Sequence, residues 1–227
     1  MSVFYFPGCK VTLHSPENSR KIRQYLMQRY DMRSAGCCNT QLDRLTGSQT
    51  AVYICPTCGA FMKEYTPETA SSSVWENLEN DDAFPWPDYG GEAISVQDCW
   101  RSFDNRPMQN AIRHILKRMN VEVVEIGENF EKTNFCGISL MKPQSPRYAR
   151  FAPVRFIERA GEKFIPKTEP EKTEKMKKHA RQFTTAKVVC YCTGCLEGLE
   201  IGGVNAVHLL DLVTANLQEF PFPSSPG

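Results

Sequence analysis

The chain has 227 residues, a formal net charge of +1 and 41% hydrophobic residues. This length is enough for one large domain or two small ones, and a core of that size needs no disulfide bonds for stability. The near-neutral charge argues against a general nucleic-acid or membrane-surface binder. No apolar run reaches the roughly 20 residues that cross a membrane. Residues 1–10 lack the basic and apolar regions of a secretory signal, so we expect a cytoplasmic protein without a membrane span.

Cysteine is the unusual component, with ten residues in the chain. Small secreted proteins use such numbers for disulfides, but this chain is too long for that class. In a reducing cytoplasm, clustered cysteines usually bind metals or carry out redox chemistry.

Strands and helices are expected to alternate along the first 65 residues, with cysteines after the strands. Residues 3–6 predict a short strand that ends just before Cys9. Ser15 followed by Pro16 is typical of a helix start. A second predicted strand over residues 51–54 leads directly into a C-x-x-C motif, and a helix is expected over residues 60–65.

The composition changes over residues 66–92, where prolines, serines and acidic residues gather. We interpret this segment as a linker with one short helix near residues 74–78. The expected domains are therefore residues 1–92, the first module with its linker, and residues 93–227, the second module. A tail over residues 220–227 is expected to be poorly ordered.

The second half repeats the alternation. An amphipathic helix is expected at 107–119, because its apolar residues recur at helical spacing. A basic insertion follows over residues 142–181, which we expect to be a solvated or mobile segment. Docking of an acidic redox partner is the alternative for this segment. The strands expected in this half cover residues 93–96, 121–126 and 188–191, with a last strand and helix within residues 204–212.

The chain thus contains one unit twice, in which cysteines follow strands and a C-x-x-C motif follows a later strand. We expect an α/β fold with two similar, mostly parallel sheets. Ligands in such folds gather beyond the carboxyl ends of the strands, where many of these cysteines fall. The first copy contains Cys9, Cys37, Cys38, Cys55 and Cys58, and the second contains Cys99, Cys136, Cys192 and Cys195.

Convergent thiolates from several loops are typical of metal sites. Four cysteines satisfy either zinc or an iron–sulfur cluster. The five cysteines of the first copy exceed the needs of one tetrahedral ion and therefore favour a polynuclear cluster. The adjacent pair Cys37-Cys38 fits neighbouring irons better than it fits a single ion.

The sequence resembles the tandem cysteine-rich CCG-domain family, which includes the CCG-domain subunit of heterodisulfide reductase and its bacterial homologues. The resemblance is carried by Phe6-Pro-Gly-Cys9, Gly36-Cys-Cys38, Cys55-Pro-Thr-Cys58, Asn134-Phe-Cys-Gly137, Cys192-Thr-Gly-Cys195 and Ala206-Val-His-Leu-Leu210. It implies two Rossmann-like CCG modules. In the first, it implies a noncubane [4Fe-4S] cluster on all five cysteines, as the active site for reductive cleavage of a small disulfide or a related sulfur compound.

Two departures from the family pattern bear on the sites. Asn39 stands where the family has glycine, and Phe135 stands where it has the first cysteine of the second pair. The second copy keeps four cysteines, which is the number that a [4Fe-4S] cubane needs. The alternatives for this copy are therefore a cubane or a site that has been lost. Cys190 is a possible further ligand, but a buried strand thiol is the better interpretation.

Other assignments follow from the chemistry expected at the first site. His14, five residues after Cys9, is a candidate proton donor to a leaving thiolate. No G-x-G-x-x-G motif, which would indicate a dinucleotide-binding site, follows a strand. We therefore expect a ferredoxin-like or flavoprotein subunit to supply electrons. The cluster of the second module is expected to pass them to the cluster of the first. Two alternatives stay open: a non-catalytic electron-transfer or adaptor subunit of a dehydrogenase complex, and a zinc-stabilised interaction module.

Overall fold

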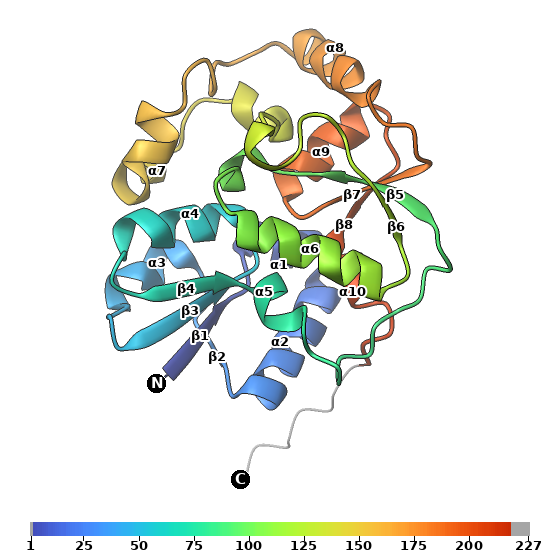
Figure 1. Cartoon of the computed structure of the whole chain (residues 1–227). Helices are drawn as coiled ribbons and strands as arrows, with labels where there is room; N and C mark the ends of the chain where they lie inside the picture. The colour runs from blue at the N-terminus through green and yellow to red at the C-terminus, as the bar shows by residue number, and fades with distance from the viewer. Residues whose placement is uncertain (1, 219–227) are drawn as a thin grey trace.

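The computed structural model describes residues 2–218, and it confirms an α/β fold built from two similar Rossmann-like units. Each unit contains a four-stranded sheet in which all neighbouring strands are parallel (Figure 1). The first sheet has the order β2-β1-β3-β4 and the second has the order β6-β5-β7-β8, so the two follow the same connectivity. The strands are β1 (Ser2–Phe6), β2 (Arg33–Ser34), β3 (Gln49–Tyr53), β4 (Ala70–Ser73), β5 (Ala93–Gln97), β6 (Glu122–Val124), β7 (Lys187–Cys190) and β8 (Ala206–His208).

Helices connect the strands and cover the sheets. In the first module they are α1 (Cys9–His14), α2 (Pro16–Tyr30), α3 (Cys38–Gln41), η1 (Leu42–Arg44), α4 (Pro56–Tyr65) and α5 (Val74–Leu78). In the second they are η2 (Trp100–Ser102), α6 (Arg106–Arg118), η3 (Phe130–Lys132), η4 (Gly137–Met141), α7 (Pro146–Phe151), the π-helix η5 (Val154–Glu158), α8 (Glu169–Ala180), α9 (Thr193–Ile201) and α10 (Leu209–Val213).

The amphipathic pattern in the second module forms α6 as predicted. Asn105 begins the helix, because its side-chain oxygen accepts a hydrogen bond from the backbone N–H of Met108. Ile112 and Ile115 are fully buried on its apolar face. The predicted strand over residues 121–126 is shorter than expected and covers only β6.

The segment predicted as a linker contributes to the first sheet. Strand β4 pairs with β3 in parallel, although its sequence of one alanine and three serines gave no strand signal. The short helix expected near residues 74–78 is present as α5. A capping box fixes its start, since the Ser73 hydroxyl accepts from the Glu76 N–H and the Glu76 carboxylate accepts from the Ser73 N–H.

Asp81 attaches the chain after α5 to helix α2. Its carboxylate accepts hydrogen bonds from the hydroxyls of Tyr25 and Tyr30 and lies 3.5 Å from Arg29 Nε. Burial by itself would raise the pKa of Asp81, but the hydrogen bonds from Tyr30 and Tyr25 outweigh burial and lower the pKa to about 2.

Asp81→Asn is therefore expected to lower the free energy of unfolding at pH 7 by about 2 kcal/mol. The folded-state pKa lies below the unfolded value, so this contribution is present above about pH 4 and is lost as the pH falls toward 2. Urea unfolding of both proteins between pH 7 and pH 2.5 measures it. A gap between the two proteins that stays constant over this range would contradict the assignment.

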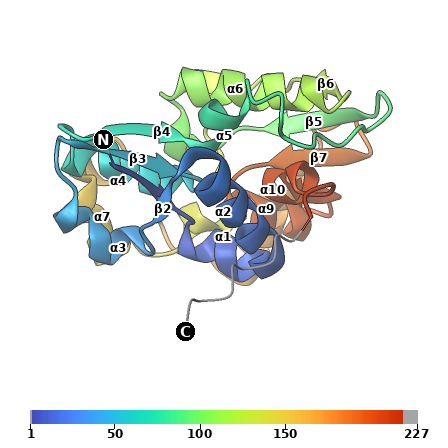
Figure 2. The same ribbon diagram turned by 90° about the horizontal axis from the view of Figure 1, so that it is seen from below.

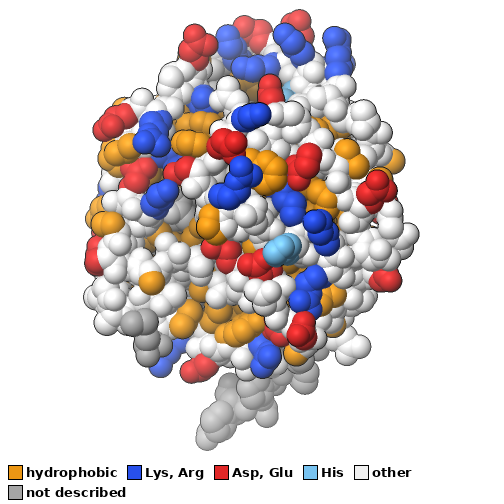
Figure 3. Space-filling model, in the orientation of Figure 1, with side chains coloured by type: hydrophobic (Ala, Val, Ile, Leu, Met, Phe, Trp, Pro, Cys, Tyr) orange, Lys and Arg blue, Asp and Glu red, His pale blue; other side chains and the backbone are white. Residues whose placement is uncertain are grey.

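The basic insertion is a packed layer, which corrects the expectation of a solvated or mobile segment. Tyr148, Phe151, Phe156 and Phe164 are buried. Phe151 and Phe156 lie against Phe61 of α4, with ring centroids 5.3 and 5.9 Å away. Arg155 and Lys172 are also buried, while most charged residues of the insertion lie at the surface, where basic and acidic side chains are mixed around α8 at the top of Figure 3. The buried aromatic residues of the insertion therefore pack it against the first module.

The two modules share an extended interface. Helix α5 packs against α6, α1 against α9, and α2 against α10. Seen from below, α1 and α2 lie beside α9 and α10 where the modules meet (Figure 2). None of the helices described within residues 2–218 combines the length and apolar character that a membrane crossing needs. The predicted tail at residues 220–227 lies outside the described residues.

Candidate metal centres

The central strands of each sheet deliver cysteines to one edge. Cys9 follows β1 and Cys55 follows β3, and these two strands are neighbours in the first sheet. Cys99 and Cys192 follow the neighbouring strands β5 and β7 in the second sheet. Both pairs lie at the point where the strand order reverses, the usual ligand site of such sheets.

Four cysteines of the second module form a compact buried group, which we call the second cysteine group. Its members are Cys99, Cys136, Cys192 and Cys195, whose sulfur atoms all lie within 4.8 Å of one another. The Sγ atom of Cys136 lies 3.6 Å from that of Cys99 and 3.8 Å from that of Cys192. These four buried thiols can bind a metal ion or an iron–sulfur cluster.

The sulfur spacing bears on which metal fits. A tetrahedral ion with metal–sulfur bonds of about 2.3 Å separates its sulfur ligands by about 3.8 Å. The two distances from Cys136 match that spacing. A cubane holds each cysteine on a different iron, so its sulfur atoms lie further apart. The sulfur–sulfur distances of the second cysteine group therefore fit a single metal ion. A cubane would require the four thiols to move apart.

Glycines allow this approach of η4 to α9. Gly137, directly after Cys136, has φ +55°, and an added Cβ would overlap the carbonyl oxygen of Gly194. An added Cβ on Gly198 would in turn overlap the Cα of Gly137. Since these obstacles are backbone atoms, only glycine fits here. The close contact brings Cys136 to the two cysteines of the C-x-x-C motif.

Arg101 connects the second cysteine group to the first module. Its side chain is buried, and its Nε donates to the Sγ atom of Cys136 over 3.1 Å. Its Nη1 donates to the hydroxyls of Thr57 and Tyr148, at 2.9 and 2.8 Å. Hydrogen bonds from the Cys192, Cys195 and Cys99 thiols, together with the positive charge of Arg101, hold the pKa of Cys136 well below its usual value.

The first cysteine group, comprising Cys9, Cys37, Cys38, Cys55 and Cys58, is more open. Cys9 is exposed, Cys37 and Cys55 are half-buried, and the other two are buried. Among the described residues, no three of these sulfur atoms gather within the 4.8 Å that encloses the second group. A hydrogen bond from the Cys58 thiol, with smaller contributions from the backbone N–H groups at the start of α4, lowers the pKa of Cys55 to about 6.

Gly8 sets the position of Cys9 beside Cys55. Its φ is +67°, and a Cβ at this position would lie 2.9 Å from the Cβ of Cys55. The turn after β1 can therefore pass close to the turn after β3, and Cys9 begins α1 at the same sheet edge.

A small pocket of about 40 Å³ lies between the two cysteine groups. Both groups contribute to its wall, the second through Cys192. Lys10, Arg101 and Arg147 add positive charge. The pocket is lined by Cys9, Lys10, Cys38, Cys55, Thr57, Cys58, Arg101, Ser139, Arg147, Tyr148, Cys192, Thr193 and Gly194.

Phe135 takes part in packing. Its ring stacks on that of His179 from α8, with centroids 3.8 Å apart and an interplanar angle of 6°. Burial lowers the pKa of His179 to about 4, so this imidazole is neutral at pH 7. The stack holds α8 over the loop that carries Cys136.

Cys190 is fully buried at the end of β7, and its thiol faces the Cys192 carbonyl oxygen at 3.7 Å. It is not part of the compact group defined among the described residues. We therefore expect Cys195→Ser to lose the metal of the second group and Cys190→Ser to keep it. Metal analysis of both variants after identical purification measures this. Equal loss from both would show that Cys190 is a ligand.

His14 faces the second module. Its Nε2 lies 3.1 Å from Asp211 Oδ2 on α10, and its ring lies 5.8 Å from that of His208. It is not among the residues that line the pocket between the cysteine groups. The structure thus gives this side chain a contact between modules, while its role as a proton donor stays a prediction.

Sequence reasoning missed Arg101, Thr57 and Tyr148 as parts of the site. Arg101 lies two residues after Cys99, and Thr57 lies inside the C-x-x-C motif of the first module. Their nearness in sequence to predicted ligand cysteines could therefore have indicated both residues. Tyr148 comes from the basic insertion and had no such signal. Searches against protein-family models and curated proteins gave no match to the chain.

Proposed function

We propose that this protein is an iron–sulfur oxidoreductase subunit resembling the CCG-domain subunit of heterodisulfide reductase, and that it reduces a disulfide or related sulfur compound at the first cysteine group. The observation that carries the proposal is the pocket between the two groups. Thiols from both modules line it, and its first-module side includes the exposed Cys9. A sulfur substrate needs such access, whereas a pure electron relay needs shielding.

The cysteines of the first group are suited to bind a polynuclear cluster. There are five of them, they come from three separate loops, and one has a pKa lowered to about 6. A cluster bound there would supply electrons one at a time. Reduction of a disulfide takes two electrons and two protons and yields two thiols, so the chain must be reduced again between the two transfers.

The positive side chains of the pocket have a separate role. Lys10 and Arg147 line it from opposite modules, and Arg101 lies at its inner end beside Cys136. Cations in a confined site attract anionic groups and orient them. Because the pocket of about 40 Å³ admits only a few atoms, we expect the sulfur end of a substrate to enter it, with a negative group of the substrate held by Lys10 and Arg147.

Electrons must come from another protein. The sequence has no dinucleotide fingerprint after a strand, so we propose a ferredoxin-like or flavoprotein donor subunit in the cytoplasm. Arg101 bridges the second cysteine group and the first module through its hydrogen bonds to Cys136 and Thr57. An iron-containing centre there would fit the role of electron entry.

The test is disulfide reduction by anaerobically prepared protein with reduced methyl viologen as the electron source. Cys58→Ser is the inactive variant and Cys190→Ser is the matched control. We expect turnover that the control keeps and Cys58→Ser loses, with an electron paramagnetic resonance signal that changes when a thiol is added. No reduction, and no thiol-dependent signal in an iron-loaded sample, would reject the proposal.

A second candidate function rests on the sulfur spacing of the second group. Distances of 3.6 and 3.8 Å fit one zinc ion as well as one iron ion. Zinc carries no redox chemistry, so the second module would then be a stabilising or adaptor unit. Metal analysis of Cys58→Ser, which keeps the second group intact, separates the two: zinc favours an adaptor role for this module and iron favours electron transfer.

A further inference from the structure

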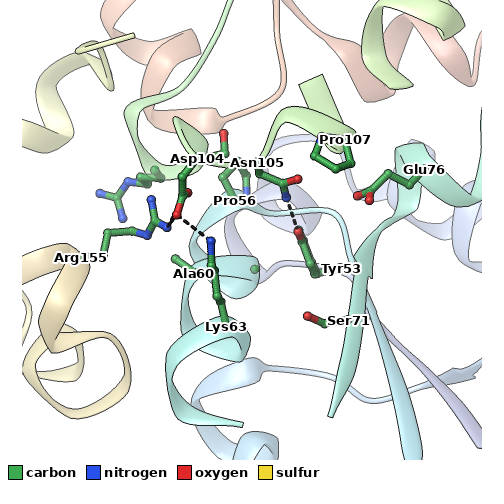
Figure 4. A pocket seen from close by; sticks show the side chains of 13 residues that line it. Tyr53, Pro56, Ala60, Lys63, Ser71, Glu76, Asp104, Asn105, Pro107 and Arg155 are labelled. Atoms are coloured by element: carbon green, nitrogen blue, oxygen red, sulfur yellow. Dashed lines mark hydrogen bonds and ion pairs between the residues drawn. The ribbon is translucent and has the colours of Figure 1, made fainter. Parts of the chain in front are cut away.

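A second opening lies between the modules and shares Arg101 with the cysteine pocket. It has a volume of about 340 Å³, within the range of about 300–1,000 Å³ that is usual for small-molecule sites. Its walls come from α4, β4 and α5 of the first module and from the turn that precedes α6 of the second. Arg155 of the insertion completes it (Figure 4).

The acidic groups of this cavity are occupied by internal partners. Both carboxylate oxygens of Asp104 accept from Arg155 Nη2, and Lys63 Nζ donates to one of them over 2.8 Å. These three side chains meet on one side of the cavity in Figure 4. Glu76 accepts from the backbone N–H and the hydroxyl of Ser73, which fixes it in the capping box of α5.

Hydrogen-bond donors, in contrast, remain unused. Arg155 is only 5% exposed, and its Nε and Nη1, which have no hydrogen-bond partner among the described residues, are sealed from solvent, so Arg155 acts on the cavity through its charge. The Ser71 hydroxyl is exposed at the cavity and has no protein partner within residues 2–218. Tyr53 accepts from Asn105 and keeps its own proton to donate, because burial raises its pKa well above 10. The lining contains three cations, Lys63, Arg101 and Arg155, and two carboxylates, Asp104 and Glu76, so its net charge is positive and favours an anion.

We propose that this cavity binds a small organic anion, with a carboxylate or phosphate group directed to the Lys63 and Arg155 side and hydroxyl groups directed to Tyr53 and Ser71. This binding does not depend on the metal content or on the redox function. The cavity also touches Arg101, whose Nε bonds to Cys136. A ligand here would therefore contact the residue that joins the cysteine groups.

Two probes represent the two sources of negative charge: malate for hydroxycarboxylates and glycerol 3-phosphate for phosphate esters. Glycerol is the neutral control, and sodium chloride keeps the ionic strength constant. Isothermal titration with the full-length protein is expected to give a dissociation constant of about 1 mM or tighter for at least one anion. The anion that binds identifies the source. Binding by neither, or equal binding of glycerol, would overturn the proposal.

Variants locate the binding. Ser71→Leu is expected to weaken it at least tenfold by filling the cavity, whereas Ala70→Leu, the adjacent position in the same edge strand, should bind as wild type. Lys63→Met should weaken binding about threefold or more. Lys10→Met tests the other positive pocket and should have no effect. If Ser71→Leu still binds the anion but Lys10→Met does not, the anion binds in the cysteine pocket and the proposal is contradicted. Thermal unfolding of each variant confirms that the variant is folded.

Discussion

Gly137→Ala should abolish metal binding by the second cysteine group while leaving the first sheet folded. The new methyl group would overlap the backbone carbonyl of Gly194, and alanine at φ +55° is itself strained. Strain and overlap together cost about 2–5 kcal/mol. The simplest relief is for η4 to move away from α9, which withdraws Cys136 from the other three thiols.

Gly161→Ala is the matched control for this variant. Gly161 has the same φ of +55°, but a Cβ there would meet no atom within 4 Å. It should cost only the backbone strain of about 1–2 kcal/mol and keep the metal. Metal per chain and the urea unfolding midpoint are measured for both variants. If Gly137→Ala behaves like Gly161→Ala, the close approach of η4 and α9 does not build the site.

Arg101→Met should destabilise the junction of the modules more than the loss of any one of its partners. The substitution keeps an apolar chain of similar length but removes the donors to Cys136, Thr57 and Tyr148. Removing one member of a buried charged network costs about 3–5 kcal/mol, because the remaining groups lose their partners. Unfolding of the reduced, chelator-treated protein measures this independently of bound metal.

Thr57→Val and Tyr148→Phe are the controls, since each removes a single partner of the guanidinium. Each is expected to cost about 1 kcal/mol. A sample with iron in the second cysteine group provides a further readout. Loss of the hydrogen bond from Arg101 to Cys136 should shift the reduction potential of this iron to lower values. An unchanged potential together with a stability loss no larger than that of Thr57→Val would show that Arg101 only fills space.

Sequence patterns were sufficient for the plan of the fold and for the second cysteine group. Apolar runs located the central strands, and parallel strands place their carboxyl ends at one edge. Cys99, Cys136, Cys192 and Cys195 could therefore be grouped without knowledge of distances, and the structure brings them together. The compactness of the group was not predictable, because it depends on the meeting of Gly137 with Gly194, far apart in the sequence.

Three features escaped prediction for physical reasons. Strand β4 consists of small residues and is positioned by pairing with β3, so it carries no apolar pattern. The insertion has a basic composition that hid its buried aromatic residues, whose partners, Phe61 of the first module and Trp100 of the second, are distant in sequence. His14 was considered for its nearness to Cys9 in sequence, but the turn of α1 directs it to Asp211.

The most direct test of the central claim is the iron, zinc and acid-labile sulfide content of anaerobically purified protein, measured beside Cys58→Ser and Cys195→Ser. We expect about four irons with matching sulfide at the first group. Cys58→Ser should lose these, and Cys195→Ser should instead lose the metal of the second group. Zinc alone without sulfide, or a metal content that neither variant changes, would contradict the assignment of a redox centre to the first group.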